Sequence, residues 1–487
     1  MTETTVERGQ RSPGAGIVKK DLSAYRTENP LLEQGVKPVG VIVPKDVLDL
    51  QAILADANAR GTPLVPVSSE GAHVKGGISC GESHTMLDLS GWKEILRVDR
   101  RNRVAMIEPG VTYAELSAEL EPHGMVVSVP LAPRRGKSVI AAVLDREPTT
   151  WPNKQWDPMD PMASSEFLFG TGDLFRTGSG GGPGSLEAQR KVGGAQKASQ
   201  GPGQTDFIRV LSGAQGCMGV ISWITIRTEL KPSIEKPQLL GSDRLEKLIP
   251  FVYDVQRPWL GDHSLLLNRT AAAMLMSAVR KVEYKSLRAS LPSYLCLQNI
   301  AGFERLPAQR VAQQYADISE KATLHELTME EDLGGLAARD LLNTARKDCG
   351  ERDWRHDLQG HCLSIFFLTT LDRAPQFIQT MEELAGKQQI DPEVLGVYVQ
   401  PIVQNHGCHI EFMVPFDPTR PADVTRIATF EREAVKKLAA VGAYFSRPYG
   451  EAQNIAFQAN PGNFEFVKTI KSLFDPNRIL NPGKFGL

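Results

Sequence analysis

Three short stretches of small and polar residues allow the backbone to approach a ligand closely, and the first two could hold a phosphate group. Residues 68–77 (SSEGAHVKGG) and 109–110 (PG) each follow a short apolar run, and residues 481–484 (NPGK) lie near the chain end, after an amphipathic run that stops at a proline. Backbone amides in such loops can bind phosphate, because no bulky side chain keeps the anion away. The last stretch also supplies one cation, Lys484.

A second group of residues is cationic and could hold an anionic substrate. Lys75 lies in the first loop, and Arg134, Arg135 and Lys137 follow in residues 131–140. Guanidinium and ammonium groups bind carboxylates and phosphates well. Lys75 and Arg135 are therefore the candidate substrate-binding residues. The alternative is that these cations are solvated loop residues.

Residues 406–409 (HGCH) place His406, Cys408 and His409 close together, as in some metal sites. Side chains alternate along a strand, so His406 and Cys408 would lie on one face and His409 on the other. The three groups would then not converge on one ion, and we expect no metal. His409 remains a candidate catalytic base.

Composition narrows the class of protein. The chain has 487 residues, with 55 Lys plus Arg and 57 Asp plus Glu, so its net charge of −2 gives no case for nucleic acid or an anionic membrane as partner. Its six scattered cysteines form no CxxC pair, which favours reduced thiols in the cytoplasm. The first residues lack an apolar core, and no apolar run is long enough to span a membrane.

The pattern of apolar residues predicts an α+β protein of two to three domains. Residues 1–35 form a polar arm. A strand, a helix and a strand follow between residues 40 and 67, and the charged, glycine-rich stretch 134–203 contains a hairpin at residues 166–178. Beyond residue 237 helices mix with strands that we expect to pair in the antiparallel direction, at residues 294–298, 362–368, 394–403 and 409–416.

The order of these motifs closely resembles the FAD enzymes of the vanillyl-alcohol oxidase and 4-cresol dehydrogenase (PCMH) kind. The stretches concerned are VPVSSEGAHVKGG, IEPGVTYAEL, SVIAAVLDRE, GDLFRTGSG, AQGCMGVIS, PYGEAQNIAF and the ending DPNRILNPGK. The resemblance implies a PCMH-type FAD-binding domain of two α/β subdomains at residues 36–235. An α+β cap on an antiparallel sheet would follow at 236–440, and residues 441–487 would return to the FAD domain.

The resemblance also implies FAD as cofactor. It assigns contacts with the flavin to Ser68, Ser69, Glu70, Gly71, Ala72, His73, Pro109, Gly110, Ser138, Val139, Ala142, Arg146, Gly219, Val220, Asn481 and Lys484. Gly219 is expected to leave room for the isoalloxazine ring. Covalent attachment through His73, Cys408 or His409 stays open.

The implied reaction is oxidation of a small alcohol, either a benzylic or allylic alcohol or a 2-hydroxy acid. The tyrosine that relatives use to bind a phenol falls on Lys75, and their Tyr-Arg pair falls within residues 451–453, so a simple 4-alkylphenol is disfavoured. Glu451 is the first candidate base and His409 the second. Electrons would leave to oxygen, a quinone or a partner subunit, and a homo-oligomer is expected.

Three departures from the family pattern support an alternative. Glu70 places a carboxylate in the phosphate loop, where it would oppose a pyrophosphate, and Ala141 and Glu147 replace glycines. The chain could therefore be a non-catalytic or degenerate flavoprotein-fold subunit of a larger complex. A nicotinamide-dependent dehydrogenase is a weaker hypothesis, because no GxGxxG motif joins a strand to a helix.

Overall fold

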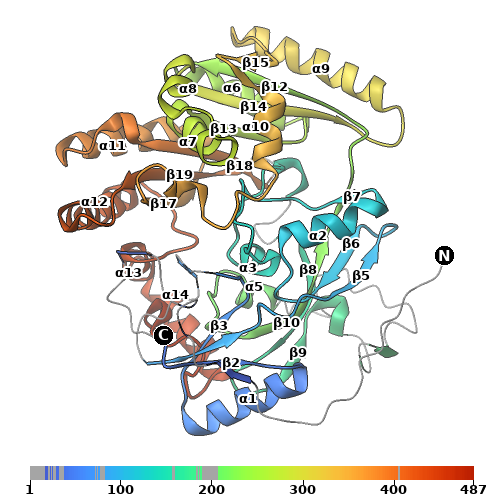
Figure 1. Ribbon diagram of the computed structural model, residues 1–487, viewed down its shortest axis with the longest axis vertical. Helices are drawn as coiled ribbons and strands as arrows, with labels where there is room; N and C mark the ends of the chain where they lie inside the picture. Colours follow the sequence, from blue (N-terminus) through green and yellow to red (C-terminus); the bar gives the residue numbers. More distant parts are fainter. Residues whose placement is uncertain are drawn as a thin grey trace.

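The computed structural model consists of an amino-terminal half and a cap that lie one against the other (Figure 1). It describes residues 38–487 except 72, 74, 77–82, 156–159, 182–184, 186, 189–206 and 404–405, together with residues 17–19, 22, 25 and 29–31. Most of the predicted arm and the predicted flavin contact Ala72 lie outside the described residues.

A small, mainly parallel sheet opens the amino-terminal half, in the order β1-β2-β4-β3. Its elements are β1 (Ile17–Lys19), β2 (Gly40–Val43), α1 (Val47–Arg60), β3 (Leu64–Val67) and β4 (Thr85–Asp88). Helix α1 begins where the Asp46 side chain accepts a hydrogen bond from the Asp49 amide, and it ends at Gly61, whose φ is 65°. This crossover brings β3 beside β4, so that the loop after β3 points toward the cap.

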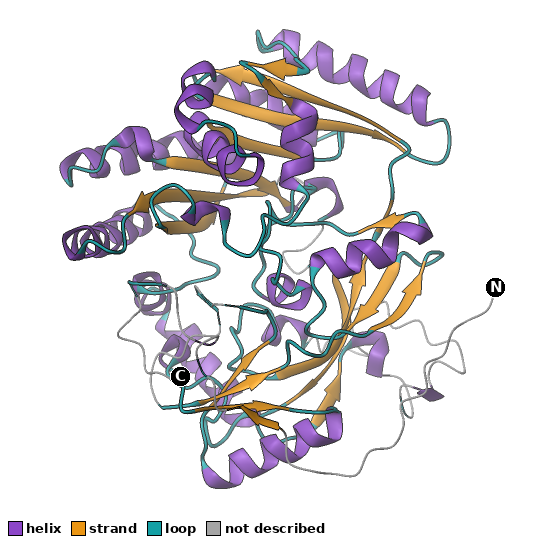
Figure 2. Ribbon diagram, in the orientation of Figure 1, coloured by secondary structure: helices purple, strands orange, loops and turns teal. Residues whose placement is uncertain are grey.

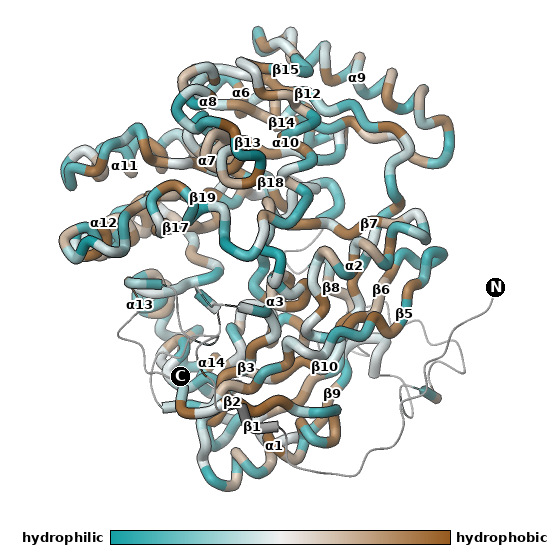
Figure 3. Tube along the Cα trace, viewed as in Figure 1, coloured by the Kyte–Doolittle hydropathy of each residue, from teal (hydrophilic) through white to brown (hydrophobic). Residues whose placement is uncertain are grey.

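A second sheet of the amino-terminal half has the order β5-β6-β10-β8-β9 and is antiparallel. The strands and helices of this part are β5 (Ile95–Asp99), β6 (Val104–Ile107), α2 (Tyr113–Leu120), β7 (Met125–Val126), α3 (Val139–Leu144), β8 (Met162–Leu168), β9 (Leu174–Arg176), α5 (Ile208–Leu211), β10 (Val220–Arg227) and β11 (Glu229–Leu230). Strands β8 and β9 form the predicted hairpin, with Gly172 at φ 87° in its turn. Figure 3 shows apolar residues gathered along β10 at the centre of this half.

The cap is built on a six-stranded antiparallel sheet in the order β12-β14-β13-β18-β19-β17, with helices on both faces (Figure 2). Its strands are β12 (Ile234–Ser242), β13 (Ser264–Asn268), β14 (Tyr294–Gly302), β17 (His361–Thr369), β18 (Gly396–Ile402) and β19 (Gly407–Phe416). A two-stranded ribbon, β15 (Asp332–Leu333) with β16 (Leu336–Ala337), lies beside β12. The predicted antiparallel cap sheet is thus confirmed.

The two faces of the cap sheet pack against different helices. One core contains α6 (Leu245–Gln256), α9 (Pro307–Leu324), α11 (Ala374–Lys387) and α12 (Pro421–Ala440), and the other contains α7 (Arg269–Arg280), α8 (Tyr284–Ser290) and α10 (Ala338–Ala345). Because side chains alternate along β19, Cys408 and Ile410 enter the first core, whereas His409 and Glu411 lie on the opposite face. That face looks toward the amino-terminal half.

The carboxy-terminal segment returns to the amino-terminal half through α13 (Glu451–Gln458) and α14 (Pro461–Phe474). After α14 the chain runs beside β3, where the Leu64 amide donates to the Ile479 carbonyl at 2.7 Å and the Asn481 amide donates to the Leu64 carbonyl at 2.8 Å. The last residues therefore reinforce the strand that carries the candidate phosphate loop. Short 3-10 turns complete the fold at Glu121–His123, Pro152–Lys154, Gly178–Gly181, Trp354–His356, Leu371–Arg373, Pro392–Val394 and Lys484–Gly486.

Candidate active site

A cavity of about 320 Å³ lies where the amino-terminal half meets the cap. Its floor comes from β3 and the loop after it, from the start of β10 and from one face of α3. Its roof comes from β17, β18 and β19, and the carboxy-terminal segment closes one side with Arg447 and Tyr449. A cavity between two units of a protein, lined by many titratable groups, is the usual location of an active site.

Hydroxyl groups fasten the candidate phosphate loop to its neighbours. The Ser68 hydroxyl lies 3.2 Å from the Ser138 hydroxyl, and the Ser138 amide donates to Ser69 Oγ at 3.1 Å. The Ser138 hydroxyl also donates to the Pro109 carbonyl at 2.5 Å, while its oxygen accepts from the Ala141 amide and so begins α3. Three segments far apart in sequence are therefore held in one arrangement before any ligand binds.

Glu70 is turned away from this cavity. Its carboxylate lies 2.7 Å from Lys93 Nζ, and Lys93 also contacts Glu115 at 2.7 Å. The Glu70 amide donates to the Gly136 carbonyl at 2.8 Å, which holds the backbone in this orientation. The carboxylate that seemed incompatible with a pyrophosphate is thus neutralised on the outer side of the loop.

Two glycines in or beside the floor, Gly110 and Gly219, are required by protein packing. A Cβ on Gly110 would overlap the Ser90 carbonyl and lie 2.8 Å from the Trp92 carbonyl oxygen. A Cβ on Gly219 would lie 3.0 Å from Phe167 and 3.1 Å from Leu211, which are both in the protein interior. The absence of a side chain at Gly219 is therefore explained by the packing of β10 against the core, while its backbone lines the cavity.

Two cations lie over one aromatic ring of the roof, that of Phe366. Lys75 Nζ and the Arg447 guanidinium each lie 4.1 Å from the centre of the Phe366 ring. Burial lowers the pKa of Lys75 to about 8, although Glu411 acts in the opposite direction. Within the described part of the chain, Lys75 has no hydrogen-bonded or ion-paired partner, so its charge is available to a ligand.

Behind these cations lies a paired set of buried groups. Arg355 donates two hydrogen bonds of 2.8 Å to Glu411, and it lies 3.3 Å from Asp353. Burial alone would raise the pKa of Glu411, but Arg355 holds it well below its ordinary value. His409 lies between this carboxylate, at 4.0 Å, and Arg447, at 3.5 Å, and burial lowers its pKa to about 4. His409 is therefore neutral near pH 7.

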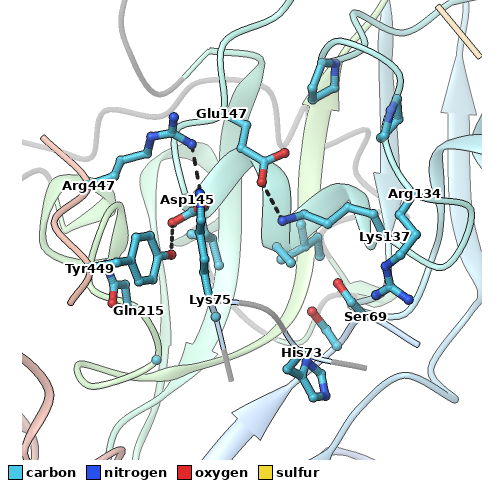
Figure 4. Close-up of a pocket in the computed structure, with 18 of the residues that line it drawn as sticks. Ser69, His73, Lys75, Arg134, Lys137, Asp145, Glu147, Gln215, Arg447 and Tyr449 are labelled. Carbon is cyan, nitrogen blue, oxygen red and sulfur yellow. Dashed lines mark hydrogen bonds and ion pairs between the residues drawn. The ribbon is translucent and has the colours of Figure 1, made fainter. Parts of the chain in front are cut away.

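The end of α3 carries two further carboxylates. Tyr449 donates to Asp145 at 2.5 Å and Arg447 lies 3.6 Å from the same carboxylate, whereas Lys137 donates to Glu147 at 2.6 Å (Figure 4). Burial raises the pKa of Asp145. Burial would also raise the pKa of Glu147, but Lys137 holds it below its ordinary value. The glutamate that replaces a family glycine is thus neutralised by a lysine of the same loop.

The structure brings eight of the twenty sequence-predicted residues to the cavity wall. These are Ser68, Ser69, His73, Lys75, Pro109, Gly219, Val220 and His409. Other predicted residues support the wall from behind or lie at its edge, namely Glu70, Gly71, Gly110, Ser138, Val139, Ala142, Arg146, Asn481 and Lys484. For α3 the difference is one of helix face, because Ile140, Ala141 and Leu144 face the cavity and Val139 and Ala142 enter the core.

Two predicted residues lie elsewhere. Glu451 is the first residue of α13 and is not part of the cavity wall, and Arg135 is exposed, 3.1 Å from Asp348 and 3.4 Å from Glu351. Of the three candidates for a covalent link, His73 and His409 line the cavity, whereas Cys408 is buried in the core beneath α11 and α12.

Sequence reasoning missed most of the roof. The residues concerned are Asp353, Arg355, Phe366, Tyr398, Glu411, Arg447 and Tyr449. One usable signal was the alternation on β19, since a strand that carries His409 toward the cavity must carry Glu411 there as well. Arg355 and Arg447 have no comparable local signal, because their positions depend on contacts with distant strands.

Two features of Gln215, at the floor of the cavity, are compatible with a bound FAD group. The Oε1 atom of Gln215 is buried in the wall without a hydrogen-bond partner among the described residues, so it can accept from a ligand N–H. Gln215 is held at a positive φ of 50° by hydrogen bonds to Pro448 and from Asn481.

In the described residues no group of histidine, cysteine and acidic side chains could hold a metal ion. No helix of that part of the chain is long and apolar enough to cross a membrane.

Comparison with known protein families gives two matches along the chain. Residues 38–178 match the model described as "FAD binding domain", and residues 269–485 match "FAD linked oxidases, C-terminal domain". These two matches span most of the chain and correspond to the amino-terminal half and to the cap with the returning segment.

Individual relatives are distant but cover nearly the whole chain. The glycolate oxidase subunit GlcD of Escherichia coli is 23% identical over 95% of this chain and 85% of its own length. The D-2-hydroxyglutarate dehydrogenase of Stutzerimonas stutzeri is 20% identical over 92% of this chain and 90% of its own length. The solved structure of p-cresol methylhydroxylase superposes with a TM-score of 0.78 at 17% identity, over 95% of this chain and 91% of that one. The last comparison bears on the fold alone.

Proposed function

The chain belongs to the FAD-linked oxidases of the PCMH and vanillyl-alcohol oxidase kind, and on that premise we propose that it oxidises the hydroxyl-bearing carbon of a small 2-hydroxy acid. FAD, when bound, accepts the electrons of such an oxidation. The chain's own residues have to bind the carboxylate, orient the carbon and accept the proton of the alcohol.

The observation that carries the proposal is an unpaired lysine beneath the roof of the cavity. Of the two lysines that line the cavity, Lys137 is paired with Glu147, whereas Lys75 has no ion-pair partner among the described residues; Lys75 and Arg447 both lie over the Phe366 ring. A carboxylate placed between them would gain two charge-assisted contacts and would supply the missing negative charge. An uncharged alcohol would leave the partly buried Lys75 unpaired, which costs free energy.

The names of two relatives agree with this choice of substrate, whereas the solved structure is named for p-cresol. Glycolate and D-2-hydroxyglutarate, which appear in the names of two relatives, both carry a hydroxyl next to a carboxylate. The phenol-binding tyrosine of the family falls on Lys75 in this sequence, so a cation stands where a phenol-specific enzyme needs a phenol partner. These points favour a 2-hydroxy acid over a 4-alkylphenol.

His409 is the proposed acceptor of the alcohol proton. Its Nδ1 atom faces Arg447 at 3.5 Å, and Arg447 can only donate, so the lone pair of Nδ1 points toward the cation. If the substrate carboxylate binds Arg447, Nδ1 becomes free to accept the proton. Glu451, the first candidate from sequence, lies outside the cavity wall and is a weaker candidate for this role.

Anaerobic reduction of the bound flavin tests the proposal. Protein loaded with FAD is mixed with glycolate, D-2-hydroxyglutarate, benzyl alcohol or 4-cresol, and the loss of flavin absorbance is followed in a stopped-flow instrument. We expect at least one 2-hydroxy acid to reduce the flavin about 100-fold faster than either uncharged compound. Lys75→Met should lower kcat/KM for that acid by about 10²- to 10³-fold, the loss of one buried charge-assisted contact.

Lys247→Met is the matched control, because Lys247 is an exposed lysine of the cap that pairs with Glu326 far from the cavity. It should leave kcat/KM unchanged. Faster reduction by benzyl alcohol or 4-cresol, or an unchanged kcat/KM in the Lys75 variant, would overturn the assignment. A protein that binds FAD, is reduced by dithionite and is reduced by none of the four compounds would support the non-catalytic subunit instead.

A further inference from the structure

Arg134 lies directly against the loop that follows β3. Its Nη1 atom is 2.6 Å from the position that a Cβ on Gly71 would occupy, and Gly71 itself has a φ of 74°, a conformation that favours glycine. The loop therefore has no side chain at the point where the guanidinium approaches its backbone. Figure 4 shows this guanidinium on the side of the cavity that Ser69 and His73 line.

Among the described residues Arg134 has no acidic partner, whereas its neighbours Arg135 and Lys137 do. Arg135 is exposed and contacts Asp348 and Glu351, and Lys137 donates to Glu147 at 2.6 Å. The acid closest in the facing loop, Glu70, is occupied by Lys93. Within the described residues Arg134 has no carboxylate within ion-pairing distance, although it lines the cavity.

The surroundings of Arg134 are electropositive. His73, on the same side of the cavity, has its pKa lowered to about 4, first by burial and next by the charge of Arg134; Asp88 opposes this shift, and Lys137 adds to it. A neutral histidine removes the repulsion that a second cation would cause, but it leaves the positive charge of Arg134 uncompensated. A site with this balance suits a ligand that carries more than one negative charge.

We propose that Arg134 is a cofactor-binding residue whose guanidinium binds the pyrophosphate of FAD. The planar guanidinium can donate two parallel hydrogen bonds to phosphate oxygens, which a lysine cannot do in the same way. This contact offsets the departures at Ala141 and Glu147, where the family has glycine. It assigns Arg134 to the cofactor and not to the substrate, and it depends on FAD binding but not on the identity of the alcohol.

Binding to the apoprotein tests this assignment without any measurement of activity. The affinities of FAD and of ADP, which has the pyrophosphate but no flavin ring, are measured by calorimetry for the wild type, Arg134→Met and Arg135→Met. Arg134→Met should weaken FAD and ADP by similar factors of about 10- to 100-fold, the usual loss for one charge-assisted phosphate contact. Arg135→Met removes the same charge from the adjacent residue and should change either affinity less than threefold.

Arg134→Lys keeps the charge and provides a variant that folds if the methionine variant does not. It should retain part of the affinity and show a steeper loss of binding at high salt than Arg135→Met, because an ammonium holds phosphate mainly through charge. Equal affinities in the two methionine variants would overturn the proposal. Weaker binding of FAD with unchanged binding of ADP would also overturn it, since Arg134 would then act on the flavin ring or on the loop.

Discussion

Lys471 on α14 forms a buried ion pair that holds the carboxy-terminal segment against the amino-terminal half. Its Nζ atom lies 2.5 Å from Asp475 and donates to the carbonyls of Cys217, at 2.6 Å, and Leu480, at 2.8 Å. The two side chains are only 3% and 0% exposed. Lys471→Met would keep the length of the side chain and remove the charge and its three hydrogen bonds.

The expected cost is large because Asp475 would remain buried without its cation. Breaking one partner of a buried pair typically costs about 3–5 kcal/mol. Asp475 would keep the hydrogen bonds from the Ile479 and Leu480 amides, which places the cost toward the lower end of that range. With about 2 cal/mol/K of unfolding entropy per residue, which is about 1 kcal/mol/K for the 487 residues, the melting temperature should fall by roughly 3–5 °C.

Lys468→Met is the control on the same helix. Lys468 pairs with Glu465 at 2.9 Å, but both side chains are partly exposed, so this pair contributes only about 0.3–0.5 kcal/mol. Release of FAD on heating, followed by flavin fluorescence, reports the melting of the amino-terminal half. Equal melting temperatures of the two variants, within about 1 °C, would refute the argument from the buried pair.

Three further predictions concern other residues. Burial and the nearby Glu451 raise the pKa of Glu431 to about 7, so the wild type should lose up to about 2–3 kcal/mol of stability as the pH rises from 4.5 to 7. Glu431→Gln should not show this loss and should be the more stable protein at pH 8 in urea unfolding. If the free energy of unfolding changes with pH in the same way in both proteins, the pKa of Glu431 is not raised. Gly110→Ala should destabilise the protein by about 1–3 kcal/mol through overlap with backbone carbonyls, whereas Gly91→Ala, whose Cβ meets no atom within 4 Å, should not. Because the pKa of Lys75 is about 8, kcat/KM for an anionic substrate should fall above that pH. In Lys75→Arg this fall should disappear. If kcat/KM of the variant still falls above pH 8, the titrating group is another residue.

The sequence alone determined the family and the composite α+β architecture, and it indicated a candidate phosphate loop at residues 68–77. Each depends on local rules. Helical spacing predicted the helix between the first two strands, the residue pattern predicted the cap strand that carries His409, and the order of the motifs identified the cofactor. Lys75 was found because it occupies a definite place in the loop of residues 68–77.

The tertiary structure decided which side chains face the cavity and which charges remain unpaired. By sequence alone Glu70 and Glu147 are unfavourable for a cofactor, but in the fold Lys93 and Lys137 pair with them. Arg135 is ion-paired at the surface, whereas the adjacent Arg134 lines the cavity. Such outcomes depend on pairing between residues far apart in the chain, as between Arg355 and Glu411. Local pattern carries no information about those distances, because the energy of an ion pair depends on its separation and its burial in the folded protein.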